Sequence, residues 1–153
     1  MILGIDGGAT ATKAVIYSQT KEKILFQCKT SPSNAILQSE VQLKEVMLNI
    51  YDDCSNFLKN DWSKVTGVAI CLAGVVNEKI HQKVLATAHI VWPKLKIFIS
   101  HDLRSALYSG AKDGQGIAVI SGTGASVFGR HGKSELRAGG WGHILGDSGS
   151  GYH

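Results

Sequence analysis

The stretch VTGVAICLAGVVNEKIHQKVLATAHIVWPKLKIFIS, residues 65–100, decides the fold class. Two short β-prone runs, at 65–72 and 96–99, flank an amphipathic helix predicted from about residue 77 to residue 89. Pro93 prevents this helix from continuing. A strand, a helix and a second strand in this order are typical of parallel strands with a helix packed across them. The stretch therefore predicts an α/β fold.

The segment that precedes this stretch has a different pattern. Three short β-prone runs follow one another at residues 1–6, 13–17 and 24–28, and their closeness in the sequence predicts an antiparallel meander. Ser39 and the three residues after it have the spacing of a capping box. Apolar residues then recur at helical spacing as far as Phe57. We expect a long amphipathic helix here, and hence a mixed sheet with helices packed on it.

The segment that follows the central stretch predicts a helix at residues 101–109 and a hairpin with strands at 117–120 and 126–128. Between them lies a polar, glycine-rich segment, which is the best candidate for a domain boundary. We therefore predict a first domain at residues 1–112 and the beginning of a second domain at residues 113–153.

The composition excludes several classes of protein. Of the 153 residues, 44% are apolar and 18% charged, which is typical of a globular domain and not of a disordered chain or a coiled coil. No apolar run reaches about 18 residues, so we expect a soluble, cytoplasmic protein without a membrane partner. The net charge of +4 comes from scattered side chains, so no nucleic-acid partner is expected. Three widely spaced cysteines predict neither a disulfide framework nor a zinc site.

A glycine-rich turn, Asp6-Gly7-Gly8-Ala9-Thr10-Ala11-Thr12-Lys13, lies between the first two predicted strands. Its glycines allow the chain to turn while backbone N–H groups and hydroxyls point at one spot, which is how a phosphate is held. An acid beside such a turn can hold a metal ion through water. A plain hairpin with an Asp-Gly turn is the other interpretation of the same residues. The turn is not a Walker A loop, because the pattern GxxxxGK[ST] does not occur.

A second turn of the same chemical type, Ser121-Gly122-Thr123-Gly124, lies between the two strands predicted after the boundary. One such turn is weak evidence for a phosphate site. Two of them, on either side of a domain boundary, favour a cleft whose halves each hold one end of a polyphosphate.

Asp102 follows the predicted strand that ends near Ser100 and opens a helix. Ligands bind at the carboxyl ends of parallel strands, and a helix N-terminus favours an ionised carboxylate. Asp102 is therefore a candidate general base for a hydroxyl proton. Capping of the helix by Asp102 or Ser100 explains the same residues equally well.

The chain also carries Gly139-Gly140-Trp141-Gly142 followed by Gly146-Asp147-Ser148-Gly149-Ser150-Gly151. With the two turns and Asp102, these motifs occur in the order found in eukaryotic-type N-acetylglucosamine kinases and the related BadF/BadG ATPase group. The sequence thus resembles this family of the actin-like, sugar kinase and heat-shock chaperone ATPase superfamily. The resemblance extends over the whole chain, and the last glycine-dense stretch is its most specific part.

The resemblance implies an actin-like, ribonuclease H-like α/β fold with a mixed sheet, followed by the start of a second, similar domain. It implies ATP and Mg²⁺ as cofactors and phosphorylation of an amino sugar, above all N-acetylglucosamine at its terminal 6-hydroxyl. Asp102 would be the catalytic base and would also contact the sugar, and Asp6 would hold the metal through water. The residues implied at the nucleotide are Asp6, Gly7, Gly8, Thr10, Thr12, Lys13, Gly122, Thr123 and Gly124, and those at the sugar are Asn34, Asp102, Gly140, Trp141, Gly142 and Asp147.

Three positions depart from the pattern of this family. Ala9 stands where a third glycine is frequent, Ala11 where a lysine is common, and Ser148 where a glutamate often follows the aspartate. The choice of sugar therefore stays open, with glucosamine and N-acetylmuramic acid as alternatives. An ATPase or activator of the BadF type without a sugar acceptor is the alternative of a different class. We further expect a homodimer, and a chain that is part of a longer protein and does not bind ATP tightly by itself.

Overall fold

The computed structural model describes residues 1–151 and contains two compact units, which divide between His101 and Asp102. The first unit comprises β1 (Ile2–Gly7), β2 (Thr12–Ser18), β3 (Lys23–Thr30), α1 (Glu40–Leu58), the 3-10 helix η1 (Lys59–Lys64), β4 (Gly67–Leu72), α2 (Glu78–Val91) and β5 (Lys96–His101). The second comprises α3 (Asp102–Gly110), β6 (Gly116–Ser121), β7 (Ala125–His131) and β8 (Ser134–Gly139).

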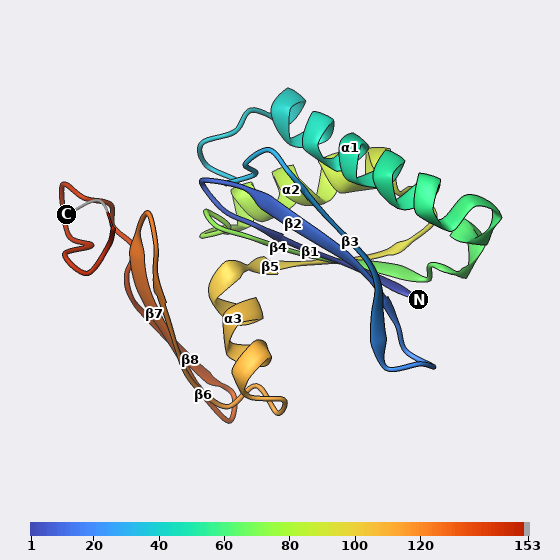
Figure 1. Cartoon of the computed structure of the whole chain (residues 1–153). Coiled ribbons are helices and arrows are strands. Elements are labelled where there is room, and N and C mark those ends of the chain that lie inside the picture. The colour runs from blue at the N-terminus through green and yellow to red at the C-terminus, as the bar shows by residue number, and fades with distance from the viewer. Residues whose placement is uncertain (152–153) are drawn as a thin grey trace. The chain divides into compact units, whose positions relative to one another are not determined.

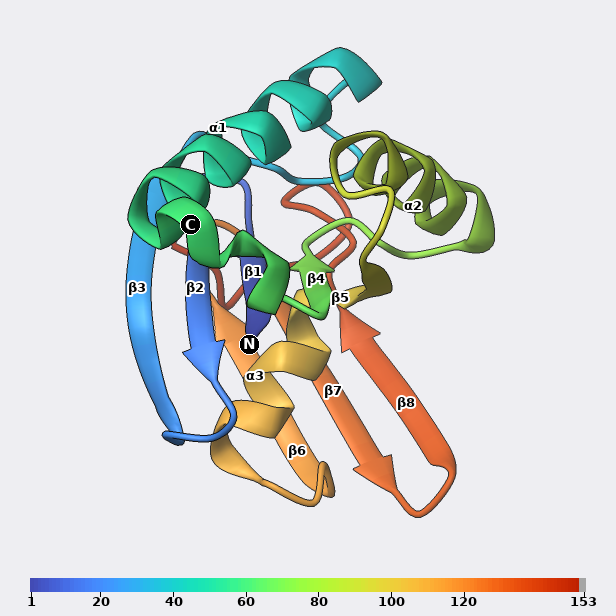
Figure 2. The same cartoon turned by 90° about the vertical axis from the view of Figure 1, so that its right-hand side faces the viewer.

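The first unit is built on a five-stranded sheet in the order β3-β2-β1-β4-β5. The strands β1, β2 and β3 pair antiparallel, whereas β4 runs parallel to both β1 and β5. Helices α1 and α2 lie side by side on one face of this sheet (Figures 1 and 2). The expected meander, the parallel strands after it and the α/β fold class are confirmed.

The two helices of the first unit begin where their capping residues predict. At α1, Ser39 Oγ accepts a hydrogen bond from the Gln42 N–H at 3.3 Å, and Gln42 Oε1 accepts one from the Ser39 N–H at 2.9 Å. At α2, Asn77 Oδ1 accepts from the Ile80 N–H at 3.0 Å. These bonds satisfy N–H groups that a helix cannot pair internally, so each cap fixes where its helix starts.

Side chains from the sheet and from both helices form the core of the first unit. Buried residues of α1 recur at helical spacing and face the strands. Phe57 is the exception to the predicted pattern: it is 44% exposed, and its ring stacks on Phe26 of β3 with centroids 4.8 Å apart. The largest fully buried side chains of this core are Leu3, Ile16, Leu43, Ile50, Ile70, Leu72, Val84 and Trp92.

The thiol of Cys54 on α1 is part of this core, and burial raises its pKa from 9.0 to about 12, with further contributions from Cys28 and Asp53. The folded state therefore holds the thiol proton more tightly than the unfolded state does. The resulting stabilisation is complete below pH 9 and is lost as the pH rises from 9 to about 12. We expect the free energy of unfolding of Cys54→Ala to fall less steeply than that of the wild type between pH 8 and pH 11.

Chemical denaturation of both proteins at a series of alkaline pH values measures this difference in slope. The cavity left by alanine lowers the free energy of unfolding by the same amount at every pH, so it does not change the slope. Parallel curves for the two proteins would therefore show that Cys54 titrates in the folded state as it does in the unfolded state.

The second unit is smaller and is also built on a meander. Its three strands pair antiparallel in the order β6-β7-β8, and α3 packs on β6 and β7. The buried residues of this unit's core are Leu103, Leu107, Ala118 and Phe128. The helix and the hairpin predicted here are confirmed, whereas β8 was not expected from the sequence. The predicted domain boundary after residue 112 stays a prediction.

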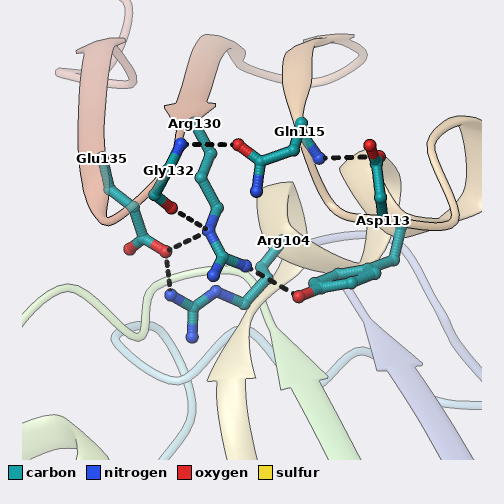
Figure 3. A network of polar contacts seen from close by, with 7 residues as sticks. Arg104, Asp113, Gln115, Arg130, Gly132 and Glu135 are labelled. Atoms are coloured by element: carbon teal, nitrogen blue, oxygen red, sulfur yellow. Dashed lines mark hydrogen bonds and ion pairs between the residues drawn. The ribbon is translucent and has the colours of Figure 1, made fainter.

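Polar contacts tie α3 to the β7-β8 hairpin within the second unit (Figure 3). The Glu135 carboxylate of β8 pairs with the guanidinium groups of Arg104 on α3 and Arg130 on β7. Arg130 Nη1 also donates to the Tyr108 hydroxyl at 2.7 Å, and the Gly132 N–H donates to Gln115 Oε1 at 2.6 Å. The contacts of Arg104 and Tyr108 give a unit with few buried apolar side chains a second set of interactions between its helix and its sheet, and the Gln115 bond joins the loop before β6 to the turn after β7.

Within residues 1–151, the helices are all too short or too polar to traverse a lipid bilayer.

Candidate functional site

The carboxyl end of the parallel strands in the first unit is the edge at which the predicted site residues of that unit gather. Gly7 ends β1 and pairs with Leu72, the last residue of β4, which in turn pairs with His101 at the end of β5. The loops that follow β1 and β4 therefore leave the sheet side by side. In sheets with parallel strands, ligands bind at this edge.

The first glycine-rich turn joins β1 to β2 at this edge. The Gly8 N–H donates to Ala11 O at 3.0 Å, which closes the turn, and Thr10 lies exposed at its tip. Asp6 on β1 pairs with Lys13 on β2, so the two side chains extend from the same face, and both are exposed. The structure thus places a carboxylate, an ammonium group and a hydroxyl around one turn. Their predicted contact with nucleotide stays a prediction.

The second glycine-rich turn joins β6 to β7 in the second unit. The Gly122 N–H donates to Gly124 O at 2.9 Å, and Thr123 is exposed between them. The Gly151 N–H donates to Gly122 O at 2.6 Å, which ties the last described residue back to the turn. Each unit therefore carries a glycine and threonine turn between the first and second strands of an antiparallel meander.

Asn34 lies in the loop between β3 and α1. At the carboxyl edge, this loop is hydrogen-bonded both to the turn after β1 and to the loop after β4. The Ser33 N–H donates to Gly8 O at 3.1 Å, and the Ala35 N–H donates to Ala73 O in the loop after β4 at 2.8 Å. Asn34 Oδ1 accepts from the Ile36 N–H at 3.0 Å and from the Leu37 N–H at 3.2 Å. The amide nitrogen is thus the end of the Asn34 side chain that can donate to a ligand.

Thr12, one of the residues predicted at the nucleotide, is completely buried. Its hydroxyl donates to Ser31 O at 2.7 Å and lies 2.7 Å from Ser33 Oγ. Both partners belong to the loop that carries Asn34. The neighbouring glycine of the turn, Gly7, has no room for a side chain, since a Cβ there would lie 1.9 Å from Ser33 Oγ. Contact of Thr12 with nucleotide stays a prediction.

Asp102, the predicted base, is the first residue of α3 and is half-buried. Its Oδ1 accepts from the Leu103 N–H at 3.0 Å, and its carbonyl oxygen accepts from Ser105 Oγ at 2.7 Å. The helix-capping interpretation of this residue therefore has a bond to support it. Catalysis by Asp102 stays a prediction.

The glycine-dense stretch of the second unit is organised around Asp147. Its Oδ1 accepts from the N–H groups of Gly140 at 3.0 Å and Trp141 at 3.2 Å. Trp141 is 73% exposed, and Gly142 adopts a φ of 83°, in the region that favours glycine. Asp147 thus shapes the loop that contains the other predicted sugar contacts of this stretch, and their contact with sugar stays a prediction.

Two residues that hold the Asn34 loop in place, and a glycine that leaves room for it, were not expected from the sequence. Ser33 pairs with Thr12, as described above. Lys83 on α2 donates from Nζ to Ala35 O at 3.0 Å and to Gln38 O at 2.6 Å. Gly74 has a φ of 85°, and a Cβ there would lie 2.6 Å from Asn34 Oδ1. A glycine at the end of a predicted strand is a signal that could have indicated Gly74. No pattern indicates Lys83.

The described residues contain no cluster of three or more His, Cys, Asp or Glu side chains able to form a metal site made entirely of protein ligands. Mg²⁺ does not need one, because it keeps several waters and is usually bound by one or two carboxylates together with substrate phosphates. The exposed carboxylate of Asp6, beside the first glycine-rich turn, is a donor of this kind. The residues present fit a metal held through water.

Comparison with known proteins adds the following. The model of the BadF/BadG/BcrA/BcrD ATPase family matches residues 3–153. The chain is 33% identical to an N-acetylmuramic acid/N-acetylglucosamine kinase of Clostridium acetobutylicum, over 99% of this chain and 49% of that protein. It is 32% identical to an N-acetyl-D-glucosamine kinase of Dictyostelium discoideum, over 99% of this chain and 50% of that protein.

Among solved structures, a proposed N-acetylglucosamine kinase of Porphyromonas gingivalis superposes with a TM-score of 0.82. The sequence identity is 25%, and the match covers 98% of this chain and 52% of that chain. The actin-like fold expected from the sequence is thereby confirmed. The chain spans about half the length of these relatives.

Proposed function

Because the chain belongs to the BadF/BadG/BcrA/BcrD ATPase family, we propose that it forms part of a kinase that transfers a phosphoryl group from ATP to an amino sugar. The favoured acceptor is N-acetylglucosamine, at its 6-hydroxyl. One observation carries the proposal: the loop with Asn34 is bonded to the first glycine-rich turn, so a residue suited to a polar acceptor adjoins a turn suited to a phosphate. The two relatives that are named as amino sugar kinases support it.

In this proposal the two glycine-rich turns hold the ATP phosphates. Backbone N–H groups and the hydroxyls of Thr10 and Thr123 would donate to phosphate oxygens, and the Lys13 ammonium would offset their charge. Asp6 would hold Mg²⁺ through water, and the ion would neutralise charge that develops on the phosphates. Positioning and charge neutralisation carry most of phosphoryl transfer, so no covalent intermediate is needed.

Asp102 would accept the proton of the attacking hydroxyl. The sugar oxygen forms a bond to the γ-phosphorus while the bond from that phosphorus to the bridging oxygen breaks, and ADP leaves. Asn34, Asp147 and the Gly140-Trp141-Gly142 segment would bind the other polar groups of the sugar and orient it. A sugar that lacks one of these polar groups would leave a hydrogen-bonding group of the site unpaired, and would therefore react less efficiently than a sugar that has them all.

An ATPase or activator without a sugar acceptor is the second candidate, because the family is described by its ATPase members. Activators that carry a metal cluster need thiolates to hold it. Among the described residues, Cys28, Cys54 and Cys71 do not form part of any group of three or more His, Cys, Asp or Glu side chains that could hold a metal. The amino sugar kinase is therefore the better-supported function.

The test is ATP turnover by the complete protein with Mg²⁺ and a panel of N-acetylglucosamine, N-acetylmuramic acid, glucosamine and glucose. We expect turnover that depends on an N-acetylated amino sugar, with a sugar phosphate detected by mass spectrometry and phosphorus NMR locating it at the 6-position. Glucose is the control for the N-acetyl group. ATP hydrolysis at the same rate without any sugar, and no sugar phosphate, would support the ATPase alternative instead.

A further inference from the structure

A pair of buried hydroxyls links the first glycine-rich turn to the loop that carries Asn34. Thr12 Oγ1 and Ser33 Oγ lie 2.7 Å apart, and the two residues are 0% and 3% exposed. Thr12 Oγ1 also donates to Ser31 O at 2.7 Å. Since the Thr12 hydroxyl has one proton and gives it to Ser31 O, Ser33 must donate to Thr12 in this pair. Both hydroxyls are thus used within the protein.

The glycine before the turn makes room for this pair. A Cβ at Gly7 would lie 1.9 Å from Ser33 Oγ and 2.6 Å from a Leu72 methyl group, so the Ser33 hydroxyl occupies the space of the missing side chain. The Ser33 N–H donates to Gly8 O at 3.1 Å, immediately beside it. The loop with Asn34 is therefore bonded to the turn through both backbone and side chain.

The other end of the same loop is held independently. Lys83 Nζ donates to Ala35 O and Gln38 O, and the Ala35 N–H donates to Ala73 O. Asn34 therefore lies between two fixed points, the hydroxyl pair on one side and the Lys83 ammonium on the other. A loop held in this way is preorganised, and binding a ligand to it does not require the loop to be ordered first.

We propose that Thr12 and Ser33 are positioning residues of the acceptor site: their buried hydroxyl pair fixes Asn34 against the first glycine-rich turn. This inference rests on the proposed function and assigns Thr12 an effect on the sugar in place of direct contact with ATP. It sets the position of the sugar-binding amide relative to the phosphate-binding turn. Phosphoryl transfer depends steeply on such positioning.

The test compares steady-state kinetics of Thr12→Val and Ser33→Ala in the complete protein. Valine has the shape of threonine without the hydroxyl, so it removes both bonds of that hydroxyl, to Ser33 Oγ and to Ser31 O, whereas Ser33→Ala removes the pair and leaves the bond to Ser31 O. We expect the KM for N-acetylglucosamine to rise about tenfold in each variant, the scale of one lost buried hydrogen bond, while the KM for ATP stays within about twofold. Thr12→Ser restores the hydroxyl and is expected to restore the KM for the sugar.

Ser18→Ala is the matched control. Ser18 is a buried hydroxyl on the same face of the same strand, at its other end, and lies 3.2 Å from Thr20 Oγ1. Its removal costs part-buried hydrogen bonds, with the Thr20 hydroxyl and from the Lys21 N–H, but touches neither the turn nor the Asn34 loop. We expect a loss of stability without a change in either KM. A rise in the KM for ATP in Thr12→Val, with the KM for the sugar unchanged, would overturn the inference and indicate direct contact with phosphate.

Hydrogen exchange of the Ser33 and Ala35 amides separates this inference from the proposed function. Both amides donate to backbone carbonyls that hold the loop, and their exchange requires the loop to open. We expect faster exchange of the Ser33 amide in Thr12→Val, a smaller change at Ala35 because that end of the loop is held independently, and no change at either amide in Ser18→Ala. If the wild type phosphorylates no sugar, the proposed function fails while this measurement still decides whether the pair holds the loop. Unchanged exchange would overturn the inference even in an active kinase, and Ser33→Ala replaces Thr12→Val should the latter fail to fold.

Discussion

Replacement of Asp102 by asparagine is expected to lower phosphoryl transfer by the complete protein about 100-fold or more, the usual scale of a general-base effect. Sugar affinity is expected to stay within about tenfold of the wild type. Asparagine is a sharp substitution here, because its Oδ1 can still accept the Leu103 N–H that Asp102 Oδ1 accepts at 3.0 Å. The Leu103 bond at the start of α3 is therefore kept, while the capacity to take a proton is lost. Steady-state kinetics gives the rate, and calorimetry gives the affinity for N-acetylglucosamine.

Asp113→Asn is the matched control for this substitution. Asp113 also belongs to the second unit, and its Oδ1 accepts a backbone N–H, that of Gln115, at 3.1 Å. The chemical change and the local bond are alike, and Asp113 has no role in the proposed reaction. We expect Asp113→Asn to retain wild-type turnover. Turnover of Asp102→Asn within a few-fold of the wild type would show that Asp102 caps the helix and is not the base.

Most of the fold could be predicted because its elements have strong local signals. The capping box at Ser39 and the alternation of strand and helix from residue 65 onward are determined by neighbouring residues, and the structure confirms both. β8 lacks such a signal: every residue of its sequence, SELRAG, is exposed, so it carries no alternation of buried and exposed positions. Its pairing with β7 comes from the tertiary structure, including the contacts of Glu135 with Arg104 and Arg130.

The candidate site could be predicted only as separate motifs. The two glycine-rich turns are local features, and the structure confirms that each joins two antiparallel strands. The bonds that hold the Asn34 loop join backbone atoms of segments far apart in the sequence, such as Ala35 and Ala73. Backbone atoms are the same in every residue, so the sequence carries no direct record of such bonds.

Thr12 lies at the start of a strand with a regular alternation of buried and exposed positions. It begins a run in which Thr12, Ala14, Ile16 and Ser18 are buried and the residues between them are less so. This alternation places Thr12 on the inner face of β2, with the core residues. Interpreting it as a phosphate contact gives weight to its residue type and its nearness to glycine. The period of the strand instead gives weight to its inner face, and the contact of Thr12 with nucleotide stays a prediction.

The second large effect is expected from Gly7→Ala. A single methyl group at this position would lie 1.9 Å from Ser33 Oγ and 2.6 Å from a Leu72 methyl group, far inside van der Waals contact. Ser33 cannot simply rotate away, because its hydroxyl is buried and bonded to Thr12. We expect a loss of about 3 kcal/mol or more in the free energy of unfolding of the first unit, the sum of overpacking and of a broken buried hydrogen bond. Chemical denaturation of the complete protein, followed through the buried Trp92, measures it.

Gly8→Ala controls for the loss of a glycine at the adjacent position. A Cβ at Gly8 would meet only Ala11 O, at the ordinary contact distance of 3.8 Å. We expect this variant to stay within about 1 kcal/mol of the wild type in stability, as substitutions without a clash usually do. Equal losses at Gly7 and Gly8 would mean that the turn needs glycine for its backbone alone. A large loss at Gly7 only would mean that the packing of Ser33 beside the turn requires this glycine. Gly7 would then support the same buried hydroxyl pair, between Thr12 and Ser33, that holds the Asn34 loop.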